Sequence, residues 1–456
     1  MHPPDRERDT LLGRARRTAA VGANMTGLAA RAGIERLFGG DDADRQIAQA
    51  LRAALGATKG PLMKVAQMLS TIPDLLPPDY AQELANLQSN APAMGAPFVR
   101  RRMRAELGEA WQDRFAEFST NAVAAASLGQ VHKARAPDGA ALACKLQYPD
   151  MASAVESDIA QLTALLALVR RLGRVIDPSE IAVEVGERLR EELDYRREAA
   201  HMRLYRAMLA GNADIVAPEP VEALSTSRLL TMTWLEGSPL AAFKTAPQAA
   251  RDNIARLLFK AWWSPMCRYG VIHGDPHLGN YSFADNGARL NLLDFGCVRV
   301  FPAHFVEGVL LLRQALMDND DEAAAHAYRI WGFATLSKAQ MDALGLWARF
   351  IYGPLLEDRV RSVADGIRPG EYGRREAMAV KEHLLAHGPV RIPREFVFMD
   401  RAAIGLGAAF LHLGAELNFR AMFEAEISDF NVMRLAERQA DALRRHGLAG
   451  PRHPPF

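Results

Sequence analysis

The spacing of apolar residues along the chain separates helical regions from extended ones. Val99, Met103 and Leu107 recur every four residues, and residues 41–112 as a whole are predicted to form a set of helices. From Phe115 onward the apolar runs become short. They predict strands over residues 115–119, 130–136 and 141–147, with a Pro-Asp-Gly turn between the last two.

Helical spacing resumes beyond these strands. It predicts one helix over residues 151–172 and a second, continuous helix over residues 179–209. The apolar run from residue 229 to residue 235 predicts another strand, and residues 253–269 predict a helix. Residues 305–446 are largely helical, and their apolar stripes predict the core of a helical lobe.

Length and composition predict a globular protein with more than one domain. The 456 residues exceed what a single hydrophobic core usually serves, and 49% of them are hydrophobic. The 55 basic and 54 acidic residues leave a net charge of +1, which argues against nucleic acid as the main partner. Cys144, Cys267 and Cys297 show no metal-ligand spacing, and so small and odd a number predicts a reducing compartment.

No apolar run is long enough to predict a transmembrane helix, and the N-terminus lacks the apolar segment of a signal peptide. A cytoplasmic location is therefore expected. Residues 1–40 interleave arginines with apolar residues, and two interpretations of them stay open: a basic amphipathic segment on a membrane surface, or a loose tail or helix packed on the body. Residues 451–456 are predicted to be a disordered tail.

Candidate chemistry is concentrated in residues 273–296. Asp275 follows a histidine and a glycine, Asn280 comes five residues later, and Asp294 begins an Asp-Phe-Gly triplet. This spacing is typical of phosphoryl transfer, in which a carboxylate accepts or orients the attacking hydroxyl and oxygen ligands hold the metal. Asp275 is the candidate base, and Asn280 and Asp294 are the candidate Mg²⁺ ligands.

The residues between the two metal candidates predict a hairpin. Residues 281–283 and 290–293 are apolar runs, and the Asp-Asn-Gly sequence at residues 285–287 is a frequent hairpin turn. Such a hairpin would place Asn280 and Asp294 at the same end of a two-stranded ribbon. They would then be close enough to share an ion.

A lysine and a loop of small residues complete the predicted nucleotide site. Lys145 lies in the third predicted strand, where protein kinases carry the lysine that contacts the phosphates. Ala124, Ala125, Ala126 and Ser127 stand where a glycine-rich loop would cover the phosphates. Their backbone N–H groups can still point at phosphate, but alanine restricts φ, so a stiffer loop is expected.

Acidic residues of the helix predicted over residues 179–209 are candidate partners for lysines. On a continuous helix Glu192 and Glu198 point about 120° apart, whereas Asp194 and Glu198, at i and i+4, share a face. A second candidate lysine, Lys64, lies on a helix that a proline begins within residues 41–112.

These motifs resemble those of the UbiB family of atypical protein-kinase-like proteins, which support ubiquinone biosynthesis. The resemblance covers roughly residues 45–300. It rests on A-A-A-S-x-G-Q-V-H at residues 124–132, on E-x-D at Glu192 and Asp194, on the Asp275/Asn280/Asp294 set, and on Lys64-Val65-Ala66-Gln67 in place of the family's K-x-G-Q. The alanine at position 66 departs from the family pattern but leaves the lysine and the glutamine in place.

The resemblance implies an α+β class with a two-lobed protein-kinase-like fold, an N-terminal helical extension and a largely helical C-terminal lobe. The extension would lie over the cleft where a protein substrate would otherwise bind. The expected boundaries are a basic tail at 1–40, the helical extension at 41–112, an N-lobe at 113–236, a C-lobe at 237–450 and a short tail at 451–456.

The family also implies binding of ATP or ADP with Mg²⁺, ATPase activity, and association with quinone-biosynthesis enzymes and with lipid, peripheral on the inner membrane. Carried over position by position, Lys145 would pair with Glu198, and Lys64 would approach Glu192 and Asp194. The backbone of four residues would bind the adenine edge: Met232, Thr233, Trp234 and Leu235.

Three functions stay open at this point. The leading one is an ATP-dependent phosphotransferase or ATPase in isoprenoid-quinone metabolism. A small-molecule kinase of the aminoglycoside or choline phosphotransferase type also tolerates His-Gly-Asp, but the alanine-rich loop and the Lys64 helix argue against it. A nucleotide-binding pseudokinase scaffold with negligible turnover ranks below the enzyme, because all the chemical groups are present.

Overall fold

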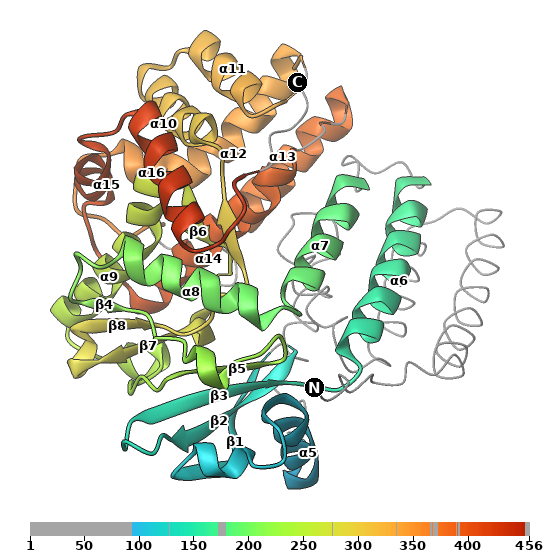
Figure 1. The fold of residues 1–456 in the computed structure, drawn as a ribbon. Coiled ribbons are helices and arrows are strands. Elements are labelled where there is room, and N and C mark those ends of the chain that lie inside the picture. Colours follow the sequence, from blue (N-terminus) through green and yellow to red (C-terminus); the bar gives the residue numbers. More distant parts are fainter. Residues whose placement is uncertain are drawn as a thin grey trace. The chain divides into compact units, whose positions relative to one another are not determined.

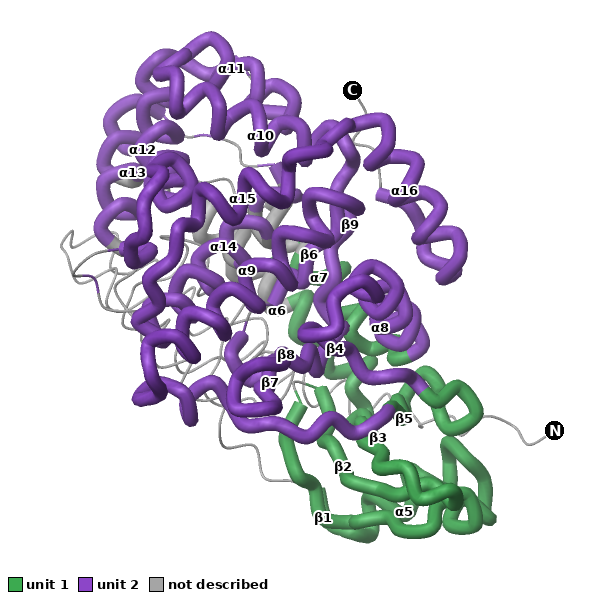
Figure 2. Tube along the Cα trace, turned by 90° about the vertical axis from the view of Figure 1, so that its left-hand side faces the viewer, with its two compact units in different colours: residues 1–173, 178–195, 221–232 green, residues 174–177, 196–220, 233–456 purple. Residues whose placement is uncertain are grey.

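The computed structural model describes residues 94–451 except Ser127, residues 172–178, Pro276, Ala334, residues 365–366 and 368–372, Pro389 and residues 391–392 (Figure 1). The predictions for the N-terminal tail, the Lys64 helix and Ser127 therefore lie outside the described residues. The chain divides into two compact units (Figure 2). The first contains Met1–Gly173, Pro178–Tyr195 and Val221–Met232, and the second contains Arg174–Asp177, Arg196–Pro220 and Thr233–Phe456.

The first unit is built on a four-stranded sheet in the order β1-β2-β3-β5. Val99 and Met103 of its first described helix are fully buried, as their spacing predicted, and they pack against Cys144 and Leu146 of the sheet. Its elements are α5 (Ala96–Leu107), the short helix η2 (Trp111–Arg114), β1 (Glu117–Ala126), β2 (Gly129–Arg135), β3 (Ala141–Gln147), α6 (Met151–Arg171), α7 (Ser179–Glu191), η3 (Glu222–Leu224) and β5 (Leu229–Thr233), whose last residue belongs to the second unit.

Strand β1 is longer than the sequence predicted. The alanines predicted to form a loop are its last three residues, and they pair antiparallel with β2 as far as Ala126 opposite Gly129. Alanine side chains are small enough to line a strand on either face, so the ladder continues across irregular pairing near Ala122. The next strand, β2, then begins at Gly129.

The continuous helix predicted over residues 179–209 is wrong. Two helices occupy this stretch, α7 and α8 (Tyr195–Met208), and residues 192–194 between them are not helical. The angles expected for Glu192, Asp194 and Glu198 on one helix therefore do not apply. No glycine or proline marks the break, which is stabilised by hydrogen bonds to the sheet.

The second unit combines two small sheets with a helical core. One sheet has the order β4-β8-β7 and the other pairs β6 with β9. Besides α8, its elements are β4 (Ile215–Val216), η4 (Leu240–Phe243), α9 (Gln248–Tyr269), β6 (Val271–His273), η5 (Leu278–Asn280), β7 (Tyr281–Ala284), η6 (Asp285–Gly287), β8 (Arg289–Leu292), β9 (Val298–Val300), α10 (Ala303–Asp318), α11 (Asp321–Ile330), α12 (Lys338–Leu356), α13 (Arg374–His387), α14 (Arg394–Leu413), α15 (Phe419–Ile427) and α16 (Val432–Arg445).

Two sequence predictions about this unit are confirmed. The β7–β8 hairpin has Tyr281 opposite Leu292 and turns at residues 285–287, and the chain from residue 303 to residue 445 is largely helical in its described parts. Together with the sheet of the first unit, this confirms the α+β class. Across the described part of the chain, no helix combines the length and apolar character needed to cross a bilayer.

The junction between α9 and β6 is fixed by a glycine and a distant glutamine. Gly270 ends α9 with a φ of +62°, and a Cβ there would lie 2.8 Å from the carbonyl oxygen of Phe301. The Gln439 amide of α16 donates to the carbonyls of Tyr269, at 2.6 Å, and Phe301, at 2.8 Å. These contacts set where β6 begins, three residues before the candidate catalytic loop.

Candidate active site

The loop that carries Asp275 leaves the sheet at the end of β6. Val271 pairs with Val300 and His273 with Val298, so the strand pairs with β9 along its whole length. The Gly274 N–H extends this pairing to the carbonyl of Cys297, at 2.6 Å. Asp275 follows at once, and its side chain is buried, with 6% exposed.

His273 connects the candidate base to the candidate metal ligand. Its Nδ1 accepts the backbone N–H of Asp275 at 3.4 Å, and its Nε2 lies 2.5 Å from the carbonyl oxygen of Asp294. The two contacts are satisfied together only by a neutral ring with its hydrogen on Nε2. One imidazole thus fixes the backbone at both carboxylate positions.

Asn280 is joined to the same group of residues. Its Nδ2 donates to the carbonyl of Asp275 at 2.9 Å, and its own carbonyl accepts the N–H of Leu293, also at 2.9 Å. The hairpin therefore brings Asn280 beside the residue that precedes Asp294, as the sequence predicted. Because the amide nitrogen faces Asp275, the amide oxygen is the end suited to a cation.

The donor set predicted from the sequence, one carboxylate and one amide, fits Mg²⁺. One oxygen of Asp294 accepts the N–H of Gly296 at 2.9 Å, which orients the carboxylate. Among the described residues no three or more His, Cys, Asp or Glu side chains gather as a metal cage. A hard cation held by two protein oxygens and by phosphate is the arrangement Mg²⁺ favours. Asp294 and Asn280 would supply those two oxygens.

Helix α8 contacts the Asp-Phe-Gly segment through two side chains. Glu198 Oε1 lies 3.5 Å from the N–H of Phe295, and His201 Nδ1 lies 3.2 Å from the carbonyl of Phe295. The Phe295 ring is fully buried and lies 5.3 Å from that of Tyr205. Glu198 was predicted from the sequence and His201 was not, because its partner lies 94 residues away along the chain.

The chain that follows β5 is fixed on the β7–β8 ribbon. Asn291 Nδ2 donates to the carbonyl of Glu236 at 3.0 Å and to Ser282 Oγ at 3.1 Å, while Ser238 and Phe283 exchange two backbone hydrogen bonds. A Cβ at Gly237 would lie 2.7 Å from Ser282 Oγ. No sequence pattern pointed to Asn291, which holds the segment just beyond the predicted adenine-binding residues.

The remaining predicted residues divide between the two units. Lys145 lies on β3 opposite Val131, with 6% of its surface exposed, and belongs to the first unit. Glu198 belongs to the second, so their pairing stays a prediction. The predicted adenine-binding residues are likewise divided between Met232 and Thr233, and their role also stays a prediction.

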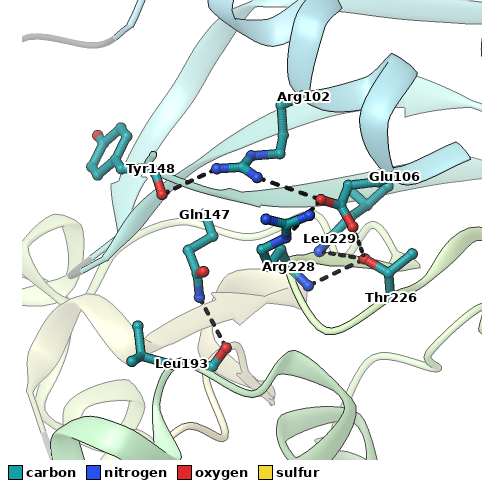
Figure 3. A network of polar contacts seen from close by, with 8 residues as sticks. All are labelled: Arg102, Glu106, Gln147, Tyr148, Leu193, Thr226, Arg228 and Leu229. Carbon is teal, nitrogen blue, oxygen red and sulfur yellow. Dashed lines mark hydrogen bonds and ion pairs between the residues drawn. The ribbon is translucent and has the colours of Figure 1, made fainter. Parts of the chain in front are cut away.

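The loop carrying Glu192 and Asp194 lies in the first unit and is hydrogen-bonded to the sheet of that unit. Glu192 is buried, with 7% exposed, whereas Asp194 is exposed. Gln147 Nε2, at the end of β3, donates to the carbonyl of Leu193 at 3.0 Å (Figure 3). Reasoning from sequence missed Gln147. The predicted approach of Lys64 to this loop lies outside the described residues.

A second polar group in the same unit joins α5 to the start of β5 (Figure 3). The Glu106 carboxylate contacts Arg102 Nη1 at 3.4 Å and Arg228 Nε at 2.9 Å, and it accepts the Thr226 hydroxyl at 2.6 Å. The second guanidinium nitrogen of Arg102 donates to the carbonyl of Tyr148 at 3.3 Å. These contacts fix the edge of the sheet next to Gln147.

The three cysteines are not exposed nucleophiles. All three are buried and none forms a disulfide. Burial raises the pKa of Cys144 to about 12, despite the opposing hydrogen bond from Thr231, so its thiol stays protonated at neutral pH.

Residues 86–328, more than half of the chain, match the model of the ABC1 atypical kinase-like domain. The chain is 33% identical over 292 residues to the atypical kinase coq-8, mitochondrial, of Caenorhabditis elegans, which covers 62% of this chain but only 38% of the nematode protein. It is 29% identical over 382 residues to the atypical kinase COQ8B, mitochondrial, of Rattus norvegicus, which covers 83% of this chain and 71% of the rat protein.

Among solved structures, the fold is similar to that of Rv3197 from Mycobacterium tuberculosis, determined as a complex with erythromycin. The TM-score is 0.57 at 26% sequence identity, over 90% of this chain and 98% of the other. Both the two-lobed kinase-like fold and the resemblance to the UbiB family are thereby confirmed. From the domain match and from relatives that are themselves named atypical kinases, we conclude that the chain belongs to the ABC1 atypical kinase-like family.

Proposed function

We propose that this protein is an atypical kinase or ATPase that binds a nucleotide with Mg²⁺ and supports the biosynthesis of isoprenoid quinones such as ubiquinone. The observation that carries the proposal is the His273 ring between the backbone of Asp275 and that of Asp294. Phosphoryl transfer depends mainly on positioning and on electrostatic stabilisation, so a base and a metal ligand fixed to one ring suit it well.

Each residue then has a distinct task. Asp275 accepts the proton of the attacking hydroxyl or water, and Asp294 with Asn280 would hold Mg²⁺, which neutralises charge on the phosphates. Lys145 would contact the phosphates, as the family resemblance implies. The backbone N–H groups of the alanines at the end of β1 would be further candidates for binding phosphate.

The quinone role rests on family membership and on the names of the relatives. The alignment spans only 38% of the nematode protein, so the acceptor of the phosphoryl group is proposed no more closely than a quinone-pathway component or water. A place beside the membrane rests on the family resemblance alone; two of the relatives are named mitochondrial.

The test is ATP hydrolysis by the purified protein, with and without Mg²⁺, anionic lipid vesicles and a soluble phenolic mimic of a quinone precursor. We expect hydrolysis that requires Mg²⁺ and rises when vesicles and mimic are added. Binding of ADP without hydrolysis in any condition would instead support the pseudokinase scaffold. Phosphate transfer to an aminoglycoside or to choline would support the small-molecule kinase.

A further inference from the structure

We propose that Tyr195 is a positioning residue that supports the ammonium group of Lys145 and couples it to the acidic loop at Glu192 and Asp194. The inference rests on the proposed function, because Lys145 acts in that site. All four residues belong to the first unit, and each step below uses contacts within that unit.

The acidic loop is attached to the sheet at two points. Gln147 Nε2 donates to the carbonyl of Leu193 at 3.0 Å, and the N–H of Tyr195 donates to the carbonyl of Ser227 at 3.1 Å. Gln147 is itself held, because its backbone N–H donates to the carbonyl of Arg228 at 3.1 Å. These bonds replace the helical bonds that the sequence would otherwise favour, so β3 and the start of β5 determine where Tyr195 lies.

The ring of Tyr195 lies against the end of Lys145. The Lys145 Nζ is 5.2 Å from the ring centroid, and the exposed fractions are 1% for Tyr195 and 6% for Lys145. An ammonium group over an aromatic face is attracted by the ring quadrupole, and the attraction grows when water is excluded. The ring therefore stabilises the charged form of Lys145 and limits where its ammonium can lie.

The start of β2 leaves room for this ring. A Cβ at Gly129 would lie 2.8 Å from the Tyr195 hydroxyl and 2.2 Å from the carbonyl oxygen of Leu146. Any larger residue would have to displace the ring or the backbone of β3. Gly129, the glycine of the A-A-A-S-x-G-Q-V-H motif, thus leaves the space that the Tyr195 ring occupies.

A buried tyrosine often does no more than fill space. Three features distinguish Tyr195: its face carries a cation, its backbone ends the acidic loop, and Gly129 makes room for its hydroxyl end. A displacement of the acidic loop would move the ring and with it the preferred position of the Lys145 ammonium. Binding of a group to Glu192 and Asp194 that displaces this loop would therefore change the position of the Lys145 ammonium.

The experiment measures the protonation of Lys145 directly, without nucleotide. Full-length wild type, Tyr195→Phe, Tyr195→Leu and Gln147→Leu are labelled with trace acetic anhydride over a pH series, and acetylation is quantified by mass spectrometry against the exposed Lys260. Removing the ring face should shift the Lys145 profile in Tyr195→Leu to lower pH by about half a unit, because the charged form loses support. Tyr195→Phe keeps the face and should match wild type. Gln147→Leu should shift in the same direction as Tyr195→Leu, by less.

A Tyr195→Leu profile that coincides with wild type, in a protein that unfolds at the usual temperature, overturns the proposal. An equal shift in Tyr195→Phe would assign the effect to the hydroxyl and would also overturn it. If Tyr195→Leu does not fold, Gln147→Leu decides, because an unshifted profile there removes the link to the loop. Binding of ADP is measured in parallel, so a shifted profile without ADP binding would refute the proposed function and leave Tyr195 as the support of Lys145.

Discussion

His273 shows how one side chain can fix two chemically active positions. Its ring accepts from the backbone of Asp275 and donates to the backbone of Asp294, which requires the neutral tautomer. A protonated ring has no lone pair at Nδ1 and would lose the contact with Asp275. The neutral ring is therefore the form that makes both backbone contacts.

Asp294→Asn should abolish the Mg²⁺-dependent part of ADP binding, because it removes the charged ligand that a hard cation requires. The measurement is a thermal-shift titration with ADP, with and without Mg²⁺. Asp285→Asn is the control, since that carboxylate lies in the hairpin turn with its side chain 61% exposed. A variant at Asp294 that kept the full Mg²⁺-dependent shift would exclude this residue from the metal site.

Asp275→Asn should leave ADP binding nearly unchanged and reduce turnover by about 10²- to 10⁴-fold, because a base acts in the chemical step rather than in ground-state binding. ATP hydrolysis and ADP titration on the same preparation separate the two effects. Parallel losses of binding and rate would make Asp275 a structural or metal-binding residue.

The candidate residues that sequence could predict are those whose relations are local. Asp275, Asn280 and Asp294 lie within one short stretch, and the hairpin turn between them is encoded where it occurs. His201 and Gln147 act on partners 94 and 46 residues away, so no local spacing reveals them. Their roles depend on tertiary contacts.

The break between α7 and α8 likewise depends on tertiary contacts. Residues 192–194 contain no glycine or proline and fit a helical pattern, so propensity alone predicts a continuous helix. Hydrogen bonds from Gln147 and to Ser227 override that preference. In contrast, the helix of Val99 and Met103, the β7–β8 hairpin and the C-terminal helices followed their local patterns.

Helix α5 is attached to the sheet by a buried charge group, which predicts a large effect of one substitution. Glu106→Ala leaves Arg102, with 5% of its side chain exposed, and Arg228 without their carboxylate, and should cost about 3 kcal/mol of unfolding free energy. Glu109→Ala is the matched control. Its pair with Arg104 is 82% and 58% exposed and should contribute less than about 1 kcal/mol. Urea unfolding of both variants decides, and equal effects would contradict the buried role of Glu106.

Asp400 of α14 lies where this helix contacts α12, and burial raises the pKa of its carboxyl group to about 7. The N–H of Trp347, 3.2 Å from the carboxylate, partly opposes this rise in pKa. The folded state therefore binds the proton more tightly than the unfolded state. The resulting stabilisation is full below about pH 4 and is lost as the pH rises to about 7.

Asp400→Asn keeps the shape of the protonated group and cannot ionise. Its melting temperature should exceed that of wild type at about pH 8, and the difference should shrink towards about pH 5. Asp342→Asn on the exposed face of α12 is the control. A difference that does not vary with pH would show that Asp400 is ionised in the fold throughout this range.

At the scale of the molecule, family membership predicts a phenotype. Deletion of the gene in a host without a redundant relative should lower cellular ubiquinone, measured by extraction and chromatography. Re-expression of wild type should restore it, and Asp275→Asn should not. Normal quinone content in the deletion strain would contradict the metabolic role without affecting the kinase-like fold.

The pairing of β6 with β9 has a consequence for how the protein folds. It closes a loop from Gly274 to Cys297 in which the β7–β8 hairpin is nested, so the contacts among Asp275, Asn280 and Asp294 all have short sequence separation. Closing nested short loops costs little chain entropy, and structures rich in such contacts form quickly. This segment can therefore assemble early, before the helices that follow it in the chain are in place.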